Sequence, residues 1–124
     1  MKTEKVKPIF SDTGDKIEMV LRVENKLHDI YTLFEAKNNQ YSTVDPFANF
    51  TTGAKLLYNN DNMCAKYETL KAYAAKHIAH VYNHSLVGPK VKESIGDIVV
   101  YFIIAWIMAD LAAEEQENET KEIS

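Results

Sequence analysis

Apolar residues recur three or four positions apart along most of this 124-residue chain. Between about residue 14 and the polar stretch "KNNQYSTVDP" at 37–46 they form one stripe: Ile17, Val20, Leu21, Val23, Leu27, Ile30 and Phe34. This spacing is typical of an amphipathic helix. Asparagines and an Asp-Pro pair, both present in the polar stretch, end helices. We therefore expect a first long helix that ends within this stretch.

Three more helices are expected further along the chain. A short one covers residues 48–57 and ends at "NNDN". A long one covers about 62–83, with an apolar face made of Met63, Tyr67, Leu70, Ala74, Ile78 and Val81. The last runs from Val91 to about residue 115, after the loop "SLVGPK". No segment alternates convincingly with a period of two, so we expect an all-α protein.

These elements predict a four-helix bundle, with three long helices and one short, as a single domain over residues 14–115. Residues 1–13 are interpreted as an N-terminal arm, and the acidic residues 116–124 as a disordered tail. The helix over 91–115 is apolar nearly all round, which requires neighbours on every side. A bundle this small hardly supplies them, so we expect a homo-oligomer that packs through this helix.

The apolar run Ile98–Ala109 is 12 residues long. A membrane span takes about 20 apolar residues, so the run predicts a buried helix and no membrane partner. The charged N-terminus "MKTEKVKPIF" lacks the apolar core of a signal peptide. The single cysteine, Cys64, cannot form an internal disulfide, which favours a reducing cytoplasm. A net charge of −4 disfavours a broad surface for a nucleic-acid polymer.

Glu93 and Asp97 lie one helical turn apart, directly before the apolar run. Two carboxylates on one helical face repel each other, and a divalent cation such as Mg²⁺ relieves that repulsion. Alternatively, they form a solvated first turn, where acids suit the positive end of the helix dipole. Gly96 between them lowers the helix propensity and allows a ligand to approach the backbone closely.

Three other segments carry residue types that suit a nucleotide. They are Lys37 and Tyr41 in "EAKNNQYS", Asn49 in "DPFANF", and Lys76, His80 and Asn83, which suit phosphate or ribose, in "AAKHIAHVYNH"; His77 of this last segment borders the apolar face and is also typical of a core histidine. Lysines contact phosphates, aromatic rings stack on a base, and asparagine bonds to a base edge. The alternatives are ordinary helix ends, core-anchoring aromatics and a solvated helix face. A zinc site on the three histidines of the last segment is disfavoured, because one straight helix cannot wrap three ligands around an ion.

The order of these segments resembles the nucleotide-modification-associated family of small phage proteins, which is grouped near the MazG-like all-α nucleoside-triphosphate pyrophosphohydrolases. The resemblance covers about residues 27–111. The positions that match the motifs of the family are Lys37, Asn38, Tyr41, Asn49, Phe50, Lys76, His77, Glu93, Ser94 and Asp97. It implies a MazG-like homo-oligomer that binds a nucleotide between helices, with Mg²⁺ held by carboxylates, and that releases a monophosphate and pyrophosphate.

The sequence departs from this pattern where the metal ligands are expected. The "E-x-x-E" pair of MazG-like enzymes is absent from the earlier helix, Gln40 replaces an acid, and Ser94 replaces another. Glu35, Glu93 and Asp97 remain as Mg²⁺ ligands, the last two as catalytic residues. The fewer acids leave two alternatives to the enzyme open: a nucleotide-binding protein without hydrolysis, such as a sponge for a defence signal, and a helical interaction protein without a ligand.

Overall fold

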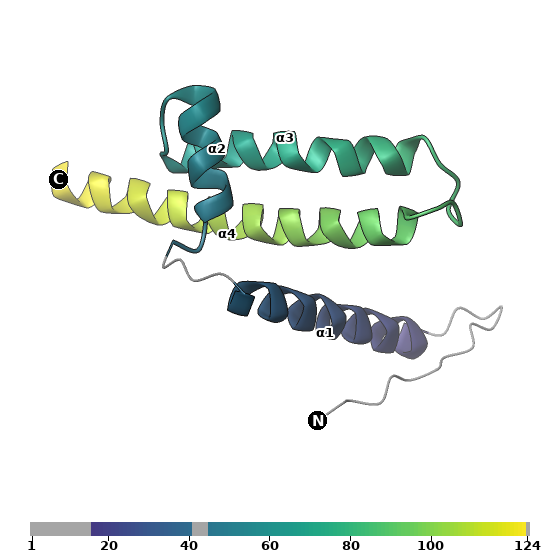
Figure 1. The fold of residues 1–124 in the computed structure, drawn as a ribbon. Coiled ribbons are helices and arrows are strands. Elements are labelled where there is room, and N and C mark those ends of the chain that lie inside the picture. Colours follow the sequence, from purple (N-terminus) through teal and green to yellow (C-terminus); the bar gives the residue numbers. More distant parts are fainter. Residues whose placement is uncertain (1–15, 41–44, 124) are drawn as a thin grey trace. The chain divides into compact units, whose positions relative to one another are not determined.

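The structure is a computed structural model that describes residues 16–40 and 45–123, the side chains of 37–40, 122 and 123 excepted. It contains four α-helices, α1 (Lys16–Gln40), α2 (Ala48–Tyr58), α3 (Met63–Tyr82) and α4 (Val91–Ile123), and no strand among these residues (Figure 1). The expected all-α class is therefore confirmed. The chain divides into two compact units, residues 1–42 and 43–124, and each is described by itself. The single domain over 14–115 stays a prediction.

The first unit contains α1. Its apolar stripe forms one face of the helix, as expected from the spacing, and Ile17, Val20 and Leu27 on this face are exposed. Most of the stability of a protein helix comes from packing of that face rather than from helix propensity. Packing of the stripe is therefore expected to contribute more to the stability of α1 than the helix propensity of its residues.

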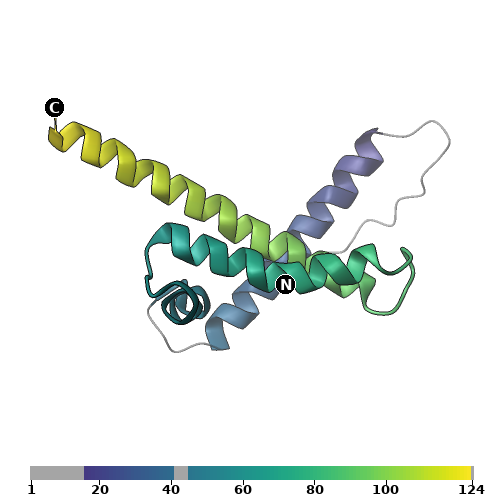
Figure 2. The ribbon, with the colours of Figure 1, turned by 90° about the horizontal axis from the view of Figure 1, so that it is seen from above.

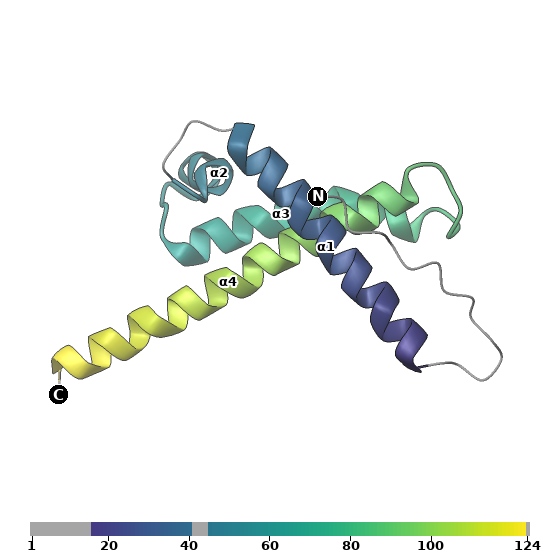
Figure 3. The same ribbon diagram turned by 90° about the horizontal axis from the view of Figure 1, so that it is seen from below.

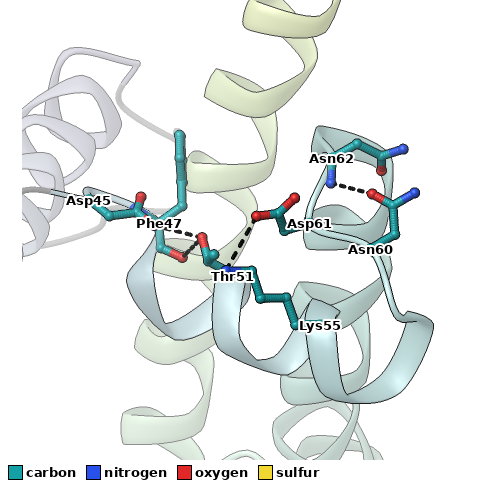
Figure 4. A network of polar contacts seen from close by, with 7 residues as sticks. All are labelled: Asp45, Phe47, Thr51, Lys55, Asn60, Asp61 and Asn62. Atoms are coloured by element: carbon teal, nitrogen blue, oxygen red, sulfur yellow. Dashed lines mark hydrogen bonds and ion pairs between the residues drawn. The ribbon is translucent and has the colours of Figure 1, made fainter.

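The start of α2 is fixed by the carboxylate of Asp45 (Figure 4). One of its oxygens accepts a hydrogen bond from the Phe47 backbone N–H at 2.8 Å, and the other accepts one from the Thr51 hydroxyl at 2.7 Å. The first N–H groups of a helix have no partner within the helix, and a carboxylate there also complements the helix dipole. These hydrogen bonds lower the pKa of Asp45.

We expect the stability of the second unit to fall below about pH 4, in part through Asp45. The pKa of Asp45 is lower in the folded chain than in the unfolded chain, so its contribution is complete above the unfolded value of 3.8 and is lost as the pH falls through the folded value. Asp45→Asn removes this titration while keeping the side-chain shape. In urea unfolding between pH 6 and 2.5, the wild type should lose roughly 1 kcal/mol more than the variant. Parallel pH profiles of the two proteins would contradict this role.

The turn between α2 and α3 uses the predicted "NNDN" segment. Asn59 adopts a left-handed conformation, with φ of 54°, and its N–H bonds to the Lys55 carbonyl oxygen. The Asn62 side chain accepts a hydrogen bond from the Ala65 N–H at 2.8 Å and so caps α3. Lys55 lies 3.6 Å from Asp61 across the turn (Figure 4). Asparagine tolerates left-handed geometry and is a preferred N-cap residue, which is why this short segment both ends one helix and begins the next.

Helices α3 and α4 run side by side in opposite directions, and α2 lies across the N-terminal part of α3 (Figures 1 and 2). Their small core contains Phe50, Leu70, Ala105 and Met108. Leu70 and Ala74 are buried, as the apolar pattern of α3 predicts. Tyr67, which was expected on the same face, is exposed, and Thr69 is buried instead. The reason is that α2 and α4 both pack on α3, which shifts its buried face towards Ala65 and Thr69.

Helix α4 is longer than expected and continues to Ile123, past the start of α3 (Figure 3). The prediction that it ends near residue 115 is wrong, and residues 116–123, interpreted as a disordered tail, are helical. Glutamate, glutamine and lysine are good helix formers, and Glu117 and Lys121 stand at the favourable i, i+4 spacing. The Thr120 hydroxyl also donates to the Gln116 carbonyl oxygen at 3.0 Å. Local interactions thus extend the helix without tertiary packing.

One helix among the described residues, over Val91–Lys121, is long and apolar enough to cross a membrane by length and composition alone. The uninterrupted run of 12 residues underestimates the apolar length of this helix. Asp97 and Asp110 bound that run, but apolar residues continue beyond them. Only 11% of its most apolar window is buried. A central helix of a water-soluble assembly meets the same criterion, so the absence of a membrane partner stays a prediction.

Candidate functional site

Asp97 of α4 faces His77 of α3. Asp97 Oδ2 lies 3.6 Å from His77 Nδ1, with the side chains 35% and 21% exposed, respectively. The two residues are 20 positions apart and belong to different predicted motifs, "KHIAHVYN" and "KESIGDIVVY". At this distance they form an ion pair whenever the imidazole is protonated, and the partial exposure leaves the carboxylate within reach of a ligand.

Three aromatic rings connect His77 to the core. The Tyr101 ring lies 5.8 Å from the His77 ring and 6.2 Å from the Phe50 ring, between centroids, and Phe50 lies 5.9 Å from Tyr73. Such separations and tilted geometries are the favourable ones for aromatic pairs. We call Phe50, Tyr73, His77, Asp97 and Tyr101 the His77 cluster. It joins α2, α3 and α4, so the position of Asp97 depends on the packing of all three helices.

The predicted role of Phe50 as a ring that stacks on a base does not fit its surroundings. The side chain is only 6% exposed and belongs to the core. It packs against Tyr73 and Tyr101, so the ring supports the cluster rather than receiving a ligand. The neighbouring Asn49 is exposed, and its carbonyl oxygen accepts a hydrogen bond from the Tyr73 hydroxyl at 3.5 Å. The amide of Asn49 therefore stays a candidate for a contact with a base.

Around the cluster, Lys76 and Glu93 are both exposed. Lys76 precedes His77 on α3. Glu93 stands one turn before Asp97 in the first turn of α4, where the positive end of the helix dipole favours it. Ser94 of the same motif is buried, and its N–H bonds to the Lys90 carbonyl oxygen at 3.0 Å. The acids available on this part of α4 are thus Glu93 and Asp97.

The other two histidines of α3 close the turn that leads to α4. His80 Nε2 donates to the Pro89 carbonyl oxygen, and His84 Nδ1 donates to the His80 carbonyl oxygen, both at 2.7 Å. The two rings stack with centroids 4.0 Å apart. His80, which was predicted to contact phosphate or ribose, already uses one ring nitrogen in this turn. Its proposed ligand contact therefore depends on the other ring nitrogen.

The predicted site residues of the first motif lie in the other unit. Glu35 is exposed on α1 and accepts a hydrogen bond from Tyr31, which raises the pKa of Tyr31. Lys37 and Asn38 fall in the last turns of α1, and their side chains are outside the described residues, as is Tyr41 entirely. The structure thus brings together Asn49, Phe50, His77 and Asp97, and the roles of Glu35, Lys37, Asn38 and Tyr41 stay predictions.

Glu93 and Asp97 are the two carboxylates on this part of α4 that were predicted to hold a metal ion. Among the residues that the structure describes, no three His, Cys, Asp or Glu side chains gather closely enough to hold one. Mg²⁺ keeps several waters and commonly takes only one or two protein carboxylates together with substrate phosphates. Binding of Mg²⁺ by Glu93 and Asp97 together with a nucleotide therefore stays a prediction.

The sequence interpretation missed two features of this unit. Tyr73 belongs to the His77 cluster, and its position one turn before His77 on α3 was the available signal. An apolar hollow of about 270 Å³ also lies between α3 and α4, lined by Met63, Cys64, Tyr67, Phe102, Ala105, Trp106, Met108, Ala109 and Ala112. No spacing rule within one helix indicates it, because two helices form its walls.

Comparisons with known proteins add no relative: no protein-family model, curated protein or solved structure matches this chain.

Proposed function

We propose that the protein binds a nucleoside or deoxynucleoside triphosphate with Mg²⁺ beside the His77 cluster and hydrolyses it to a monophosphate and pyrophosphate. The observation that carries this proposal is the contact between Asp97 and His77, whose ring packs against Tyr101 and through it against Phe50. Motifs that are separate in the sequence, and that the resemblance singles out, supply these residues. Their convergence at a partly exposed carboxylate is what a ligand site requires.

Each residue of the site has a role that follows from its chemistry. Asp97 and Glu93 would hold the cation, and His77 limits the orientations of the Asp97 carboxylate. Lys76, exposed next to His77, would balance phosphate charge. When bound, Mg²⁺ neutralises the phosphates and acidifies a coordinated water. In the reaction the water oxygen bonds to the α-phosphorus, the bond to the β-phosphate bridge breaks, pyrophosphate leaves with that electron pair, and a proton is released.

A second function, nucleotide binding without hydrolysis, is favoured by the same contact. The Asp97 carboxylate already lies 3.6 Å from the His77 imidazole. A carboxylate occupied by an imidazole can accept a hydrogen bond from a ribose or a base without holding a metal. Such a protein would sequester a nucleotide signal.

Incubation of the purified protein with each ribo- and deoxyribonucleoside triphosphate and Mg²⁺ tests these functions, with products resolved by anion-exchange chromatography. Release of equal amounts of monophosphate and pyrophosphate supports the hydrolase. Intact nucleotide that remains bound after desalting supports the binding protein. If no nucleotide or cyclic nucleotide is turned over or raises the melting temperature, both functions are excluded, and a helical interaction protein remains.

A further inference from the structure

Within the second unit, helix α4 carries two apolar stripes, and only one of them packs against another helix of that unit. The first consists of Val91, Ser94, Ile98, Tyr101, Ala105, Met108 and Ala112, which are buried or half-buried against α3. The second consists of Ile95, Val99, Phe102, Trp106, Ala109 and Ala113, all of which are exposed. We call the second stripe the α4 seam. Its intervals of four and three residues repeat without a break, which is the heptad spacing of a coiled-coil interface.

The seam is separate from the His77 cluster. At about 100° per residue, the centre of the seam lies roughly 100° around α4 from the centre of the packed stripe. Asp97 lies roughly 160° around the helix from the centre of the seam. An occupant of the seam thus leaves Asp97 uncovered on α4. This inference therefore does not rest on the proposed nucleotide chemistry.

The apolar area of the seam is large for a monomer surface. Trp106 is 73% exposed and Phe102 42%. Together with Ile95, Val99 and the adjoining Tyr67, they present roughly 500 Å², taking about 150–250 Å² for a fully exposed large side chain. The largest apolar patch of a typical monomer is about 300–600 Å² and is often functional. Two such faces in contact bury roughly 1,000 Å², the lower limit for a specific interface.

We propose that the occupant is the α4 seam of a second copy of this chain, packed antiparallel across a two-fold axis. In antiparallel pairing, a residue at heptad position 'a' of one helix meets a residue at heptad position 'd' of the other. The residues of the seam then form complementary layers. Ile95 meets the partner's Ala113, Val99 meets the partner's Ala109, and Phe102 meets the partner's Trp106. Large residues thus face small ones towards the ends, and aromatic residues pair at the centre. The apolar hollow beside Phe102, Trp106 and Ala109 lies along this central part.

Charge selects the antiparallel direction. The N-terminal end of α4 carries Lys92, Glu93 and Asp97, preceded by Lys90, so its charges balance, whereas its C-terminal part carries five acids, Asp110, Glu114, Glu115, Glu117 and Glu119, before Lys121. Antiparallel pairing brings Lys92 beside the partner's Glu117, whereas parallel pairing brings the two acidic ends together. Like charges along a coiled coil disfavour an orientation, and opposite charges favour it.

Sedimentation equilibrium of the full chain tests the assembly. We expect a dimer for the wild type, and a dissociation constant at least about 30-fold higher for Trp106→Glu. Val87→Glu is the matched control, because Val87 is 93% exposed in the turn before α4, and it should dimerise like the wild type. Should Trp106→Glu lose helicity, Lys92→Glu supplies the second variant: it should weaken the dimer, and adding Glu117→Lys should restore it. A wild type that stays monomeric at several hundred micromolar overturns the proposal.

Cross-linking tests the direction of pairing. In a Cys64→Ser background, chains with Ile95→Cys are oxidised alone, chains with Ala113→Cys are oxidised alone, and the two are then mixed and oxidised together. We expect disulfide-linked dimers only from the mixture, because residue 95 meets residue 113 in the antiparallel register. Links within the Ile95→Cys sample would indicate parallel pairing and overturn the proposal. Flotation of a monomeric wild type with phosphatidylcholine–phosphatidylglycerol vesicles would also overturn it, since lipid would then be the occupant.

Discussion

Replacing Asp97 by asparagine is expected to reduce the rate of pyrophosphate release by about 100-fold or more. Loss of a residue that only orients a metal ligand already costs about 10–100-fold, and Asp97 is proposed as a ligand itself. Asparagine keeps the size of the side chain but removes the negative charge that would hold Mg²⁺ in the proposed site, next to His77. The measurement is pyrophosphate release at saturating nucleotide and a series of Mg²⁺ concentrations.

The control for this variant is Asp110→Asn. Asp110 is an exposed acid on the same helix, away from the His77 cluster, so the change in net charge is identical. Its activity should stay within about twofold of the wild type. Full hydrolysis by Asp97→Asn would remove Asp97 from the catalytic residues. If the wild type binds nucleotide without turnover, Glu93→Gln should leave binding intact, which identifies the binding protein instead.

The helices were predictable because their signals are local. The apolar spacing and the asparagines at 59–62 indicated α2 and α3, and the structure places the caps Asn59 and Asn62 there. The end of α4 was misjudged because an acidic composition was interpreted as disorder, although the same residues are good helix formers. Composition alone does not distinguish a solvated helix from a disordered tail when no breaking residue is present.

The packing of residues in the site was less predictable than their identity. Asp97 and His77 were named from separate motifs, but no sequence rule states that they lie 3.6 Å apart. Phe50 was assigned to a ligand, yet it is buried, because an aromatic residue at the start of α2 also has two tyrosines available to pack against. Whether such an aromatic residue contacts a ligand or packs in the core depends on contacts between helices. Those contacts are set by three-dimensional packing rather than by spacing within one helix.

The close approach of α2 to α3 leads to a prediction on stability. A Cβ atom at Gly53 would stand 2.6 Å from Thr69 Cγ2 and would also meet the Tyr73 hydroxyl, whereas one at Gly96 would meet nothing within 4 Å. Thr69 cannot rotate away easily, because it is fully buried and its hydroxyl donates to the Ala65 carbonyl oxygen at 2.8 Å. Gly53 is therefore required by packing, and Gly96 is not.

Gly96→Ala should raise the free energy of unfolding by about 0.5–1 kcal/mol, the ordinary gain of alanine over glycine within a helix. Gly53→Ala has the same intrinsic gain but forces α2 away from α3, so its free energy of unfolding should lie about 1–3 kcal/mol below that of Gly96→Ala. Urea unfolding of both variants measures the difference. Because the displaced Tyr73 supports Phe50 and the His77 cluster, Gly53→Ala should also weaken nucleotide binding, which a change confined to stability would not do. Equal stability of the two variants would contradict the packing of α2 on α3.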